Sequence, residues 1–326
     1  MATYKEIHGV KVQYRDSDAT AVEGDVWYNS ATGLLKMYAS AGSWASGNNM
    51  NTGRSSLGGG GTQTAAWAAA GYISDYSNAT EKYDGSTWTS SGDTNTARSE
   101  LGAGGPASPQ TAAIIFAGKT PPAPGTAVAV AETYDGSTWT EVADLNTARR
   151  RNLDGCGTTT ACIAFGGGNP DPTRAQAENY DGSSWTEVGD LNTGRMDTVG
   201  AGSSNNAALC IGGYQPPGRT AVVESWNGSS WTEVGDLNTA RYVLAAAGTS
   251  TATLAFGGND PSPANVAITE SYDGSSWTEV ADLPAAIKLH HGAGTSSLAV
   301  SFAGEPAVVT TNEWAFSASI ETIGFD

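Results

Sequence analysis

Five arginines recur in phase along the chain, and they are the first residues whose type and spacing could do chemistry. Each follows a tryptophan by ten residues, at the end of an Asn-Thr-Ala/Gly-Arg motif. The five are Arg54, Arg98, Arg149, Arg195 and Arg241. A ring of guanidinium groups could trap a carboxylate, a phosphate or an acidic sugar, because guanidinium binds such groups through parallel hydrogen bonds.

Five glutamates suggest a structural role for these arginines instead. Each stands two residues before the aromatic residue of its own repeat; they are Glu81, Glu132, Glu178, Glu224 and Glu270. In the last repeat, Ile287 replaces the arginine and Asn312 replaces the glutamate. This joint loss favours structural ion pairs over an anion site.

Other catalytic and metal-binding patterns find little support in the sequence. The chain has three histidines, two of them adjacent, and three cysteines without the spacing of a zinc site or a disulfide framework. It contains no twelve-residue calcium loop and no Gly-x-Ser-x-Gly motif. We therefore predict a protein that is not an enzyme and that needs no metal and no cofactor.

The elements that must position these residues are short strands in a repeat. The motif Tyr-Asp-Gly-Ser-Ser/Thr-Trp-Thr recurs, and Trp185, Trp231 and Trp277 are each 46 residues apart. Within a repeat, Asp-Gly separates two apolar runs, which predicts a β-hairpin. Each repeat has room for four short antiparallel strands, so it predicts one blade of a β-propeller.

The ends of the chain are predicted to close a ring. Six glycine-rich first strands indicate six blades, but the last repeat lacks an outer Trp-Thr-Glu-Val strand. The segment around Trp44 can supply it, so that N- and C-terminal strands pair and no sheet edge stays open. We predict an all-β chain with an N-terminal arm and hairpin at residues 1–41 and a six-bladed propeller at residues 42–326.

The repeat resembles the kelch repeat, in which a double glycine is followed by a spaced tyrosine and tryptophan. The motif is carried by Phe165-Gly166-Gly167, Tyr180 and Trp185, and again by Phe256-Gly257-Gly258, Tyr272 and Trp277. The first repeat departs from it, because Ala69-Ala70-Gly71 replaces the double glycine. The resemblance covers about residues 42–316 and implies a kelch-like propeller.

Proline-rich loops of diverse sequence are predicted to lie on one face of the propeller, opposite the near-identical Asp-Gly turns. Rigid, diverse loops on a fixed scaffold are typical of a binding surface. The loop residues expected to make contacts are Arg174, Tyr214, Arg219, Asp171 and Asp260. The alternative is a set of surface loops that merely tolerate variation.

Residues 24–38 read as a hairpin around Ser30-Ala31-Thr32-Gly33. This stretch resembles a short module of bacteriophage virion proteins, particularly the tail fibre and appendage proteins of marine phages. The resemblance implies a virion structural protein, assembled in the host cytoplasm, with residues 1–41 binding other virion proteins. Its propeller would bind a host cell-surface glycan or protein, or a neighbouring protein.

Charge and hydropathy exclude other partners. The net charge is −17, which repels nucleic acid and anionic membranes at long range. The sequence shows neither a secretory signal nor an apolar run long enough for membrane insertion.

Two alternatives to the virion hypothesis stay open: a free bacterial kelch interaction module, and a polysaccharide-degrading propeller enzyme with carboxylates from different blades.

Overall fold

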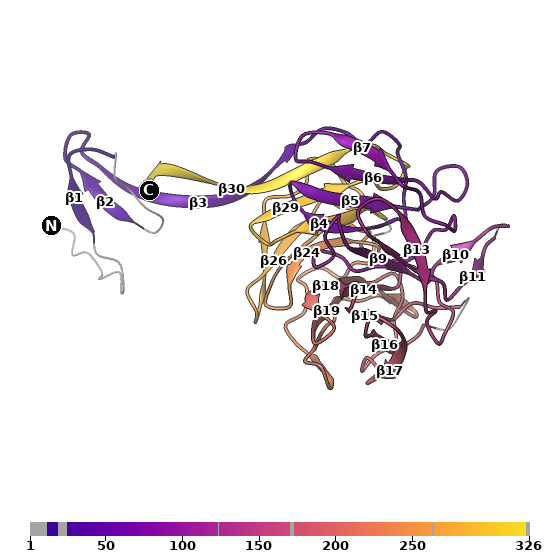
Figure 1. Cartoon of the computed structure of the whole chain (residues 1–326). Helices are drawn as coiled ribbons and strands as arrows, with labels where there is room; N and C mark the ends of the chain where they lie inside the picture. The colour runs from indigo at the N-terminus through magenta and orange to yellow at the C-terminus, as the bar shows by residue number, and fades with distance from the viewer. Residues whose placement is uncertain (1–11, 19–24, 123, 170–172, 263, 324–326) are drawn as a thin grey trace. The chain divides into compact units, whose positions relative to one another are not determined.

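The structure, a computed structural model, describes residues 12–18, 25–122, 124–169, 173–262 and 264–323. The regular elements of this described part are β-strands arranged mainly in antiparallel sheets (Figure 1). None of its elements is a helix long and apolar enough to cross a membrane. The chain divides into two compact units, Met1–Ser43 with Ala315–Asp326, and Trp44–Trp314.

The second unit contains five four-stranded sheets. Sheet 1 has β4 (Gly58–Thr62), β5 (Ala65–Ala69), β6 (Thr80–Tyr83) and β7 (Trp88–Ser91). Sheet 2 has β8 (Gly102–Ala103), β9 (Ala113–Phe116), β12 (Ala131–Tyr134) and β13 (Trp139–Val142). Sheet 3 has β14 (Asp154–Thr158), β15 (Ala161–Phe165), β16 (Ala177–Tyr180) and β17 (Trp185–Val188). Sheet 4 has β18 (Val199–Ser204), β19 (Ala207–Ile211), β22 (Val223–Trp226) and β23 (Trp231–Glu233). Sheet 5 has β24 (Ala245–Thr249), β25 (Ala252–Phe256), β26 (Thr269–Tyr272) and β27 (Trp277–Val280).

Sheet 6 combines the two ends of the second unit. It contains β28 (His291–Gly294), β29 (Leu298–Phe302) and β30 (Thr311–Thr322), and β3 (Leu34–Ser46) is hydrogen-bonded to β30. The amide of Gly47 continues this pairing by donating to the Thr311 carbonyl at 2.9 Å. Trp44 therefore lies beside the third strand of the last repeat, where the sequence predicted it.

The hairpins form where the sequence contains its repeated turns. At the outer turn of sheet 5, Asp273 Oδ1 accepts the amides of Ser275 and Ser276, both at 2.8 Å. The pairing of Tyr272 with Trp277 across this turn confirms the hairpin that Asp-Gly predicted. At the inner turn, Gly248 has φ +131°, and a Cβ there would lie 2.2 Å from the Ala252 carbonyl oxygen. Only glycine fits this close approach of two strands.

Consecutive sheets share their hydrophobic cores. Trp67 of sheet 1 packs with Trp139 of sheet 2, and Phe116 of sheet 2 packs with Trp185 of sheet 3. The same pattern joins sheet 6 to sheet 1, where Phe302 packs against Trp88 with ring centroids 5.1 Å apart. The first strands also contact one another in the order β4, β8, β14, β18, β24, β28 and β4. This arrangement is compatible with a β-propeller.

The first unit contains β1 (Gln13–Arg15) parallel to β2 (Val26–Asn29), and β2 antiparallel to β3. The β2–β3 pairing confirms the predicted hairpin. Asp18 accepts hydrogen bonds from Trp27 and Asn29 and pairs with Lys36 at 2.8 Å, and these contacts lower the pKa of the Asp18 carboxyl. Residues 315–323, which the sequence predicted to lie in the propeller, belong to this unit.

Candidate binding face

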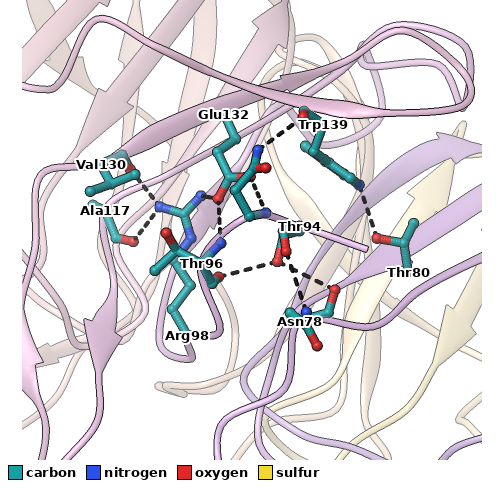
Figure 2. Close-up of polar contacts among 10 residues, drawn as sticks. Asn78, Thr80, Thr94, Thr96, Arg98, Ala117, Val130, Glu132 and Trp139 are labelled. Atoms are coloured by element: carbon teal, nitrogen blue, oxygen red, sulfur yellow. Dashed lines mark hydrogen bonds and ion pairs between the residues drawn. The ribbon is translucent and has the colours of Figure 1, made fainter. Parts of the chain in front are cut away.

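The five in-phase arginines are buried in the segments that lead into the first strands, each against a glutamate. Figure 2 shows Arg98 and Glu132, whose Nη2 and Oε1 atoms are 2.8 Å apart. All five arginines have no exposed surface. The five pairs are Arg54–Glu81, Arg98–Glu132, Arg149–Glu178, Arg195–Glu224 and Arg241–Glu270. These guanidinium groups cannot reach a ligand on the surface.

The rest of the Asn-Thr-Ala-Arg motif binds the same carboxylate. The backbone amide and the side-chain amide of Asn95 donate to Glu132 Oε2 at 2.7 and 3.0 Å, and the Thr96 amide donates to Oε1 at 3.3 Å. The Asn95 side chain also donates to the Trp139 carbonyl at 2.9 Å. The Asn, Thr and Arg residues of the motif thus bind one glutamate together, and we call this unit the carboxylate clasp. The sequence predicted the contact of the arginine with the glutamate but not that of the asparagine.

Each guanidinium also reaches backbone carbonyls. Arg98 Nη1 donates to the carbonyls of Val130, at 2.6 Å, and Ala117, at 3.4 Å. Burial lowers the pKa of Arg98 to about 10, and the nearby Glu132 opposes that shift. Arg98 therefore remains charged at neutral pH, with its Nη1 and Nη2 atoms bonded within the protein and its buried Nε without a partner.

Two of the predicted contact residues come together in a small hairpin. Tyr214 on β20 (Tyr214–Gln215) pairs with Arg219 on β21 (Gly218–Arg219). The Arg219 guanidinium lies over the Tyr242 ring, with Cζ 4.9 Å from the ring centroid, and its Nη2 donates to Asn259 Oδ1 at 2.7 Å. The rings of Tyr214 and Tyr242 have centroids 6.2 Å apart.

This hairpin is fastened to the start of sheet 4. The amide of Tyr214 donates to the Met196 carbonyl at 2.7 Å, and the Met196 amide donates back at 3.1 Å. The side chains of Tyr214, Arg219 and Tyr242 are thus held by backbone pairing and by stacking. Aromatic and arginine side chains held in this way are typical of the residues that dominate binding surfaces.

The other three predicted contact residues are placed differently. Asp260 Oδ1 accepts the Ser262 hydroxyl and amide, so this carboxylate forms a turn, and Ser262 and Arg219 both lower its pKa. Arg174 is not among the described residues that line the pocket of about 340 Å³ with Arg219, and its amide donates to the Gly167 carbonyl at 2.8 Å. Asp171 lies outside the described residues.

A pocket of about 340 Å³ lies beside the β20–β21 hairpin. It is lined by Tyr214, Arg219, Tyr242, Arg151, Asp197 and Met196. Burial raises the pKa of Asp197 to about 6, although Asn152 donates to its Oδ1 at 2.8 Å. Sequence reasoning missed Tyr242 and Arg151. One sequence feature could have indicated Tyr242. It directly follows an arginine of the Asn-Thr-Ala-Arg motif, at a position whose residue differs from repeat to repeat.

A smaller cavity lies between the first strands and contains buried titratable groups. Asp154 Oδ2 accepts the Gly200 amide at 2.9 Å, and burial raises the pKa of Asp154 to about 7. His290 has no hydrogen-bond partner for either ring nitrogen, and burial lowers its pKa to about 3. Among the described residues, no group of three His, Cys, Asp or Glu side chains is placed to hold a metal ion.

Comparisons with family models and with curated proteins identify no relative of this chain. No family model matches the chain, and no curated protein matches its sequence. The arrangement of the residues themselves must therefore indicate the function.

Proposed function

We propose that this chain is a non-enzymatic binding protein built as a six-bladed, kelch-like β-propeller. Three observations support the architecture: the cores shared by consecutive sheets, the cyclic order of first-strand contacts, and the position of β3 beside β30. In this architecture the six sheets are the blades, and the Trp44 segment completes the last one.

The observation that carries the binding function is the aromatic pocket beside the β20–β21 hairpin. Arg219 is oriented by Tyr242 and Asn259, so little side-chain freedom is lost when it contacts a ligand. The arginines of the carboxylate clasps are buried and cannot contact a ligand. The surface that differs between blades is the face that carries the variable loops, which we call the loop face.

We further propose that the protein is a phage virion component of the tail fibre or decoration type. The support is the resemblance of residues 24–38 to a virion-protein module. Residues 1–41 would bind other virion proteins, and the propeller would present its loop face to a host surface or to a neighbouring protein.

A binding assay on bacterial envelopes and on virion proteins tests this function. The variant Arg219→Ala/Tyr242→Ala should lose binding, whereas Leu298→Ala, at a leucine of the second unit that is 50% exposed, should not. Equal binding by both variants would contradict the proposed face. Release of reducing ends from envelope polysaccharide would contradict the non-enzymatic assignment.

The virion assignment has its own test. A chain lacking residues 1–41 should fail to join phage particles during assembly, while the full chain is incorporated. Equal incorporation of the two chains would refute a role for these residues in attachment and would favour a free interaction module.

A further inference from the structure

The pocket beside the β20–β21 hairpin is one end of a longer groove. A central pocket of about 170 Å³ shares Arg151, Asp197 and Tyr242 with it. A third pocket, of about 460 Å³, shares Ser56, Glu100 and Leu289 with the central one. The three pockets therefore adjoin one another in a row, and we call this row the transverse groove. It runs from the loops of sheets 1 and 2 to those of sheets 4 and 5.

The end of the groove at sheets 1 and 2 has a pair of tyrosines. Tyr72 and Tyr76 pack edge to face, with ring centroids 5.9 Å apart, and Tyr72 is 41% exposed. Lys119 Nζ lies 5.9 Å from the centroid of the Tyr76 ring. The backbone of Tyr72 pairs in both directions with Ser55, so this aromatic platform is fixed to the scaffold.

The opposite end repeats this chemistry with a second pair of tyrosines. Tyr214 and Tyr242 form the second pair, and Arg219 takes the place of Lys119 above one ring. Tyr72 and Tyr214 take the same repeat position, directly after the glycine that follows the second strand, where the other repeats hold Lys119, Gly168, Asn259 and Glu305. Tyr76 and Tyr242 come from positions that are not equivalent, so the repeat does not by itself produce the two pairs. In the proposed ring, sheets 1 and 2 lie across from sheets 4 and 5. A ligand that touches both platforms must be extended.

The middle of the groove offers hydrogen bonds of both kinds. Glu100 Oε1 is 2.6 Å from Lys119 Nζ, and Glu100 Oε2 has no partner. Arg151, Asp197 and Lys288 complete a lining in which acceptors and donors alternate. Hydroxyl groups donate and accept, so they can satisfy such a lining, whereas a ligand of one charge would meet like charges along its length.

We propose that the transverse groove binds an extended, neutral polysaccharide chain, with a sugar ring stacked at each tyrosine pair and the intervening hydroxyls bonded to the central polar residues. The apolar C–H face of a sugar ring fits an exposed aromatic ring. The net charge of −17 disfavours a polyanion. An extended peptide would need apolar anchor pockets, but Val243, Leu289 and Met196 supply few apolar contacts. This inference rests on the proposed binding function and specifies its ligand.

The test measures binding of the full chain to dextran, pullulan, galactomannan and a neutral O-chain polysaccharide from Gram-negative envelopes, with heparin as the polyanion. Fragments of increasing length made from any polysaccharide that binds form the second series. We expect affinity to rise with length until both platforms are engaged. Removing either platform, by Tyr72→Ala/Tyr76→Ala or by Tyr214→Ala/Tyr242→Ala, should then weaken binding of the long chain about 10- to 100-fold.

Matched variants separate stacking from folding. Tyr72→Phe and Tyr242→Phe keep the rings and should retain binding, and Tyr14→Ala should bind as the unaltered chain does. Equal affinity for short and long fragments, binding of heparin alone, or no binding of any neutral polysaccharide would overturn the inference. If the chain binds envelopes or virion proteins but no polysaccharide, the proposed function stands and this inference fails; if it binds neither, both fail.

Discussion

The backbone amide of Ser56 donates a hydrogen bond to the carbonyl of Leu289 at 2.9 Å, joining the first repeat to the last. The same bond links internal neighbours, from Glu100 to Ser56 at 3.0 Å and from Leu289 to Val243 at 2.9 Å. All four residues have positive φ, between 50° and 54°. Such a backbone costs about 1–3 kcal/mol at a non-glycine residue. The hydrogen bonds that this backbone conformation allows join consecutive repeats and support the proposed ring.

The clasp predicts a large loss of stability when one partner of an ion pair is removed. Glu132→Ala leaves the Arg98 guanidinium buried without a carboxylate, and it also deprives Asn95 of its acceptor. Removing one partner of a buried pair costs about 3–5 kcal/mol. Urea denaturation followed by tryptophan fluorescence should show this loss in the free energy of unfolding.

The last repeat supplies the control for that experiment. It holds Ile287 and Asn312 at the arginine and glutamate positions, so the fold already tolerates this combination. The double variant Arg98→Ile/Glu132→Asn should therefore lose less stability than the sum of its single variants. Strict additivity of the two losses would show that the side chains act independently.

The repeated elements could be predicted from the sequence because each one recurs. Asp-Gly predicted the outer hairpins, and the joint loss at Ile287 and Asn312 indicated that arginine and glutamate lie together. The transverse groove could not be predicted. Tyr72 and Tyr214 share a repeat position, but Tyr76 and Tyr242 do not, and only the three-dimensional arrangement brings Tyr72 and Tyr242 to one groove. The positive φ of Ser56 also has no sequence signal, because a neighbouring carbonyl imposes it.

Substituting alanine at two glycines, one in a crowded turn and one in open space, tests how closely the strands approach at the inner turns. Gly248→Ala places a methyl group 2.2 Å from the Ala252 carbonyl oxygen at φ +131°, so we expect a loss of more than about 1 kcal/mol. Gly218→Ala adds a methyl group with nothing within 4 Å and should change stability by less than about 0.5 kcal/mol. Thermal unfolding of the two variants gives the comparison, and equal melting temperatures would contradict the close approach of strands.

We predict that the buried His290 ring lowers the stability of the folded protein. Other repeats hold Leu57, Leu101, Leu153 and Leu244 at this position, and the two ring nitrogens of His290 are unsatisfied. Replacing the ring in His290→Leu should raise the free energy of unfolding by about 1–3 kcal/mol at neutral pH. Denaturant midpoints of the two proteins at pH 7 measure this gain.

The same variant should change how stability depends on pH. Burial, with the charges of His291 and Arg241, lowers the pKa of His290 from 6.5 to about 3. Between these values the unfolded chain binds a proton and the folded chain does not, so stability falls as pH drops from about 6.5 towards 3. His290→Leu should lose less stability over this range. Asp154 remains in both proteins, so its opposite trend cancels in the comparison. Parallel curves would mean that His290 is charged or solvated in the folded state.

Trp44 tests whether the two ends of the second unit complete one structure. Its ring packs on Phe256 at 4.9 Å between centroids, and its Nε1 donates to Thr269 Oγ1 at 3.1 Å, so it joins sheet 6 to sheet 5. Trp139 makes the equivalent contact within the repeats, donating to Thr80 Oγ1 at 2.9 Å.

If the ends complete a ring, Trp139→Ala, at a buried tryptophan, should cost about 3–5 kcal/mol. Trp44→Ala, at a partly buried tryptophan, should lower the free energy of unfolding by a smaller amount. Hydrogen exchange should then show lost protection in the inner strands of several sheets, because removing one contact between sheets weakens the whole cooperative unit. Loss confined to β3 and β30 in the Trp44→Ala variant would mean that the N-terminal strand is an appendage on an open array. The transverse groove would then lack the fixed separation between its two aromatic platforms on which an extended ligand depends.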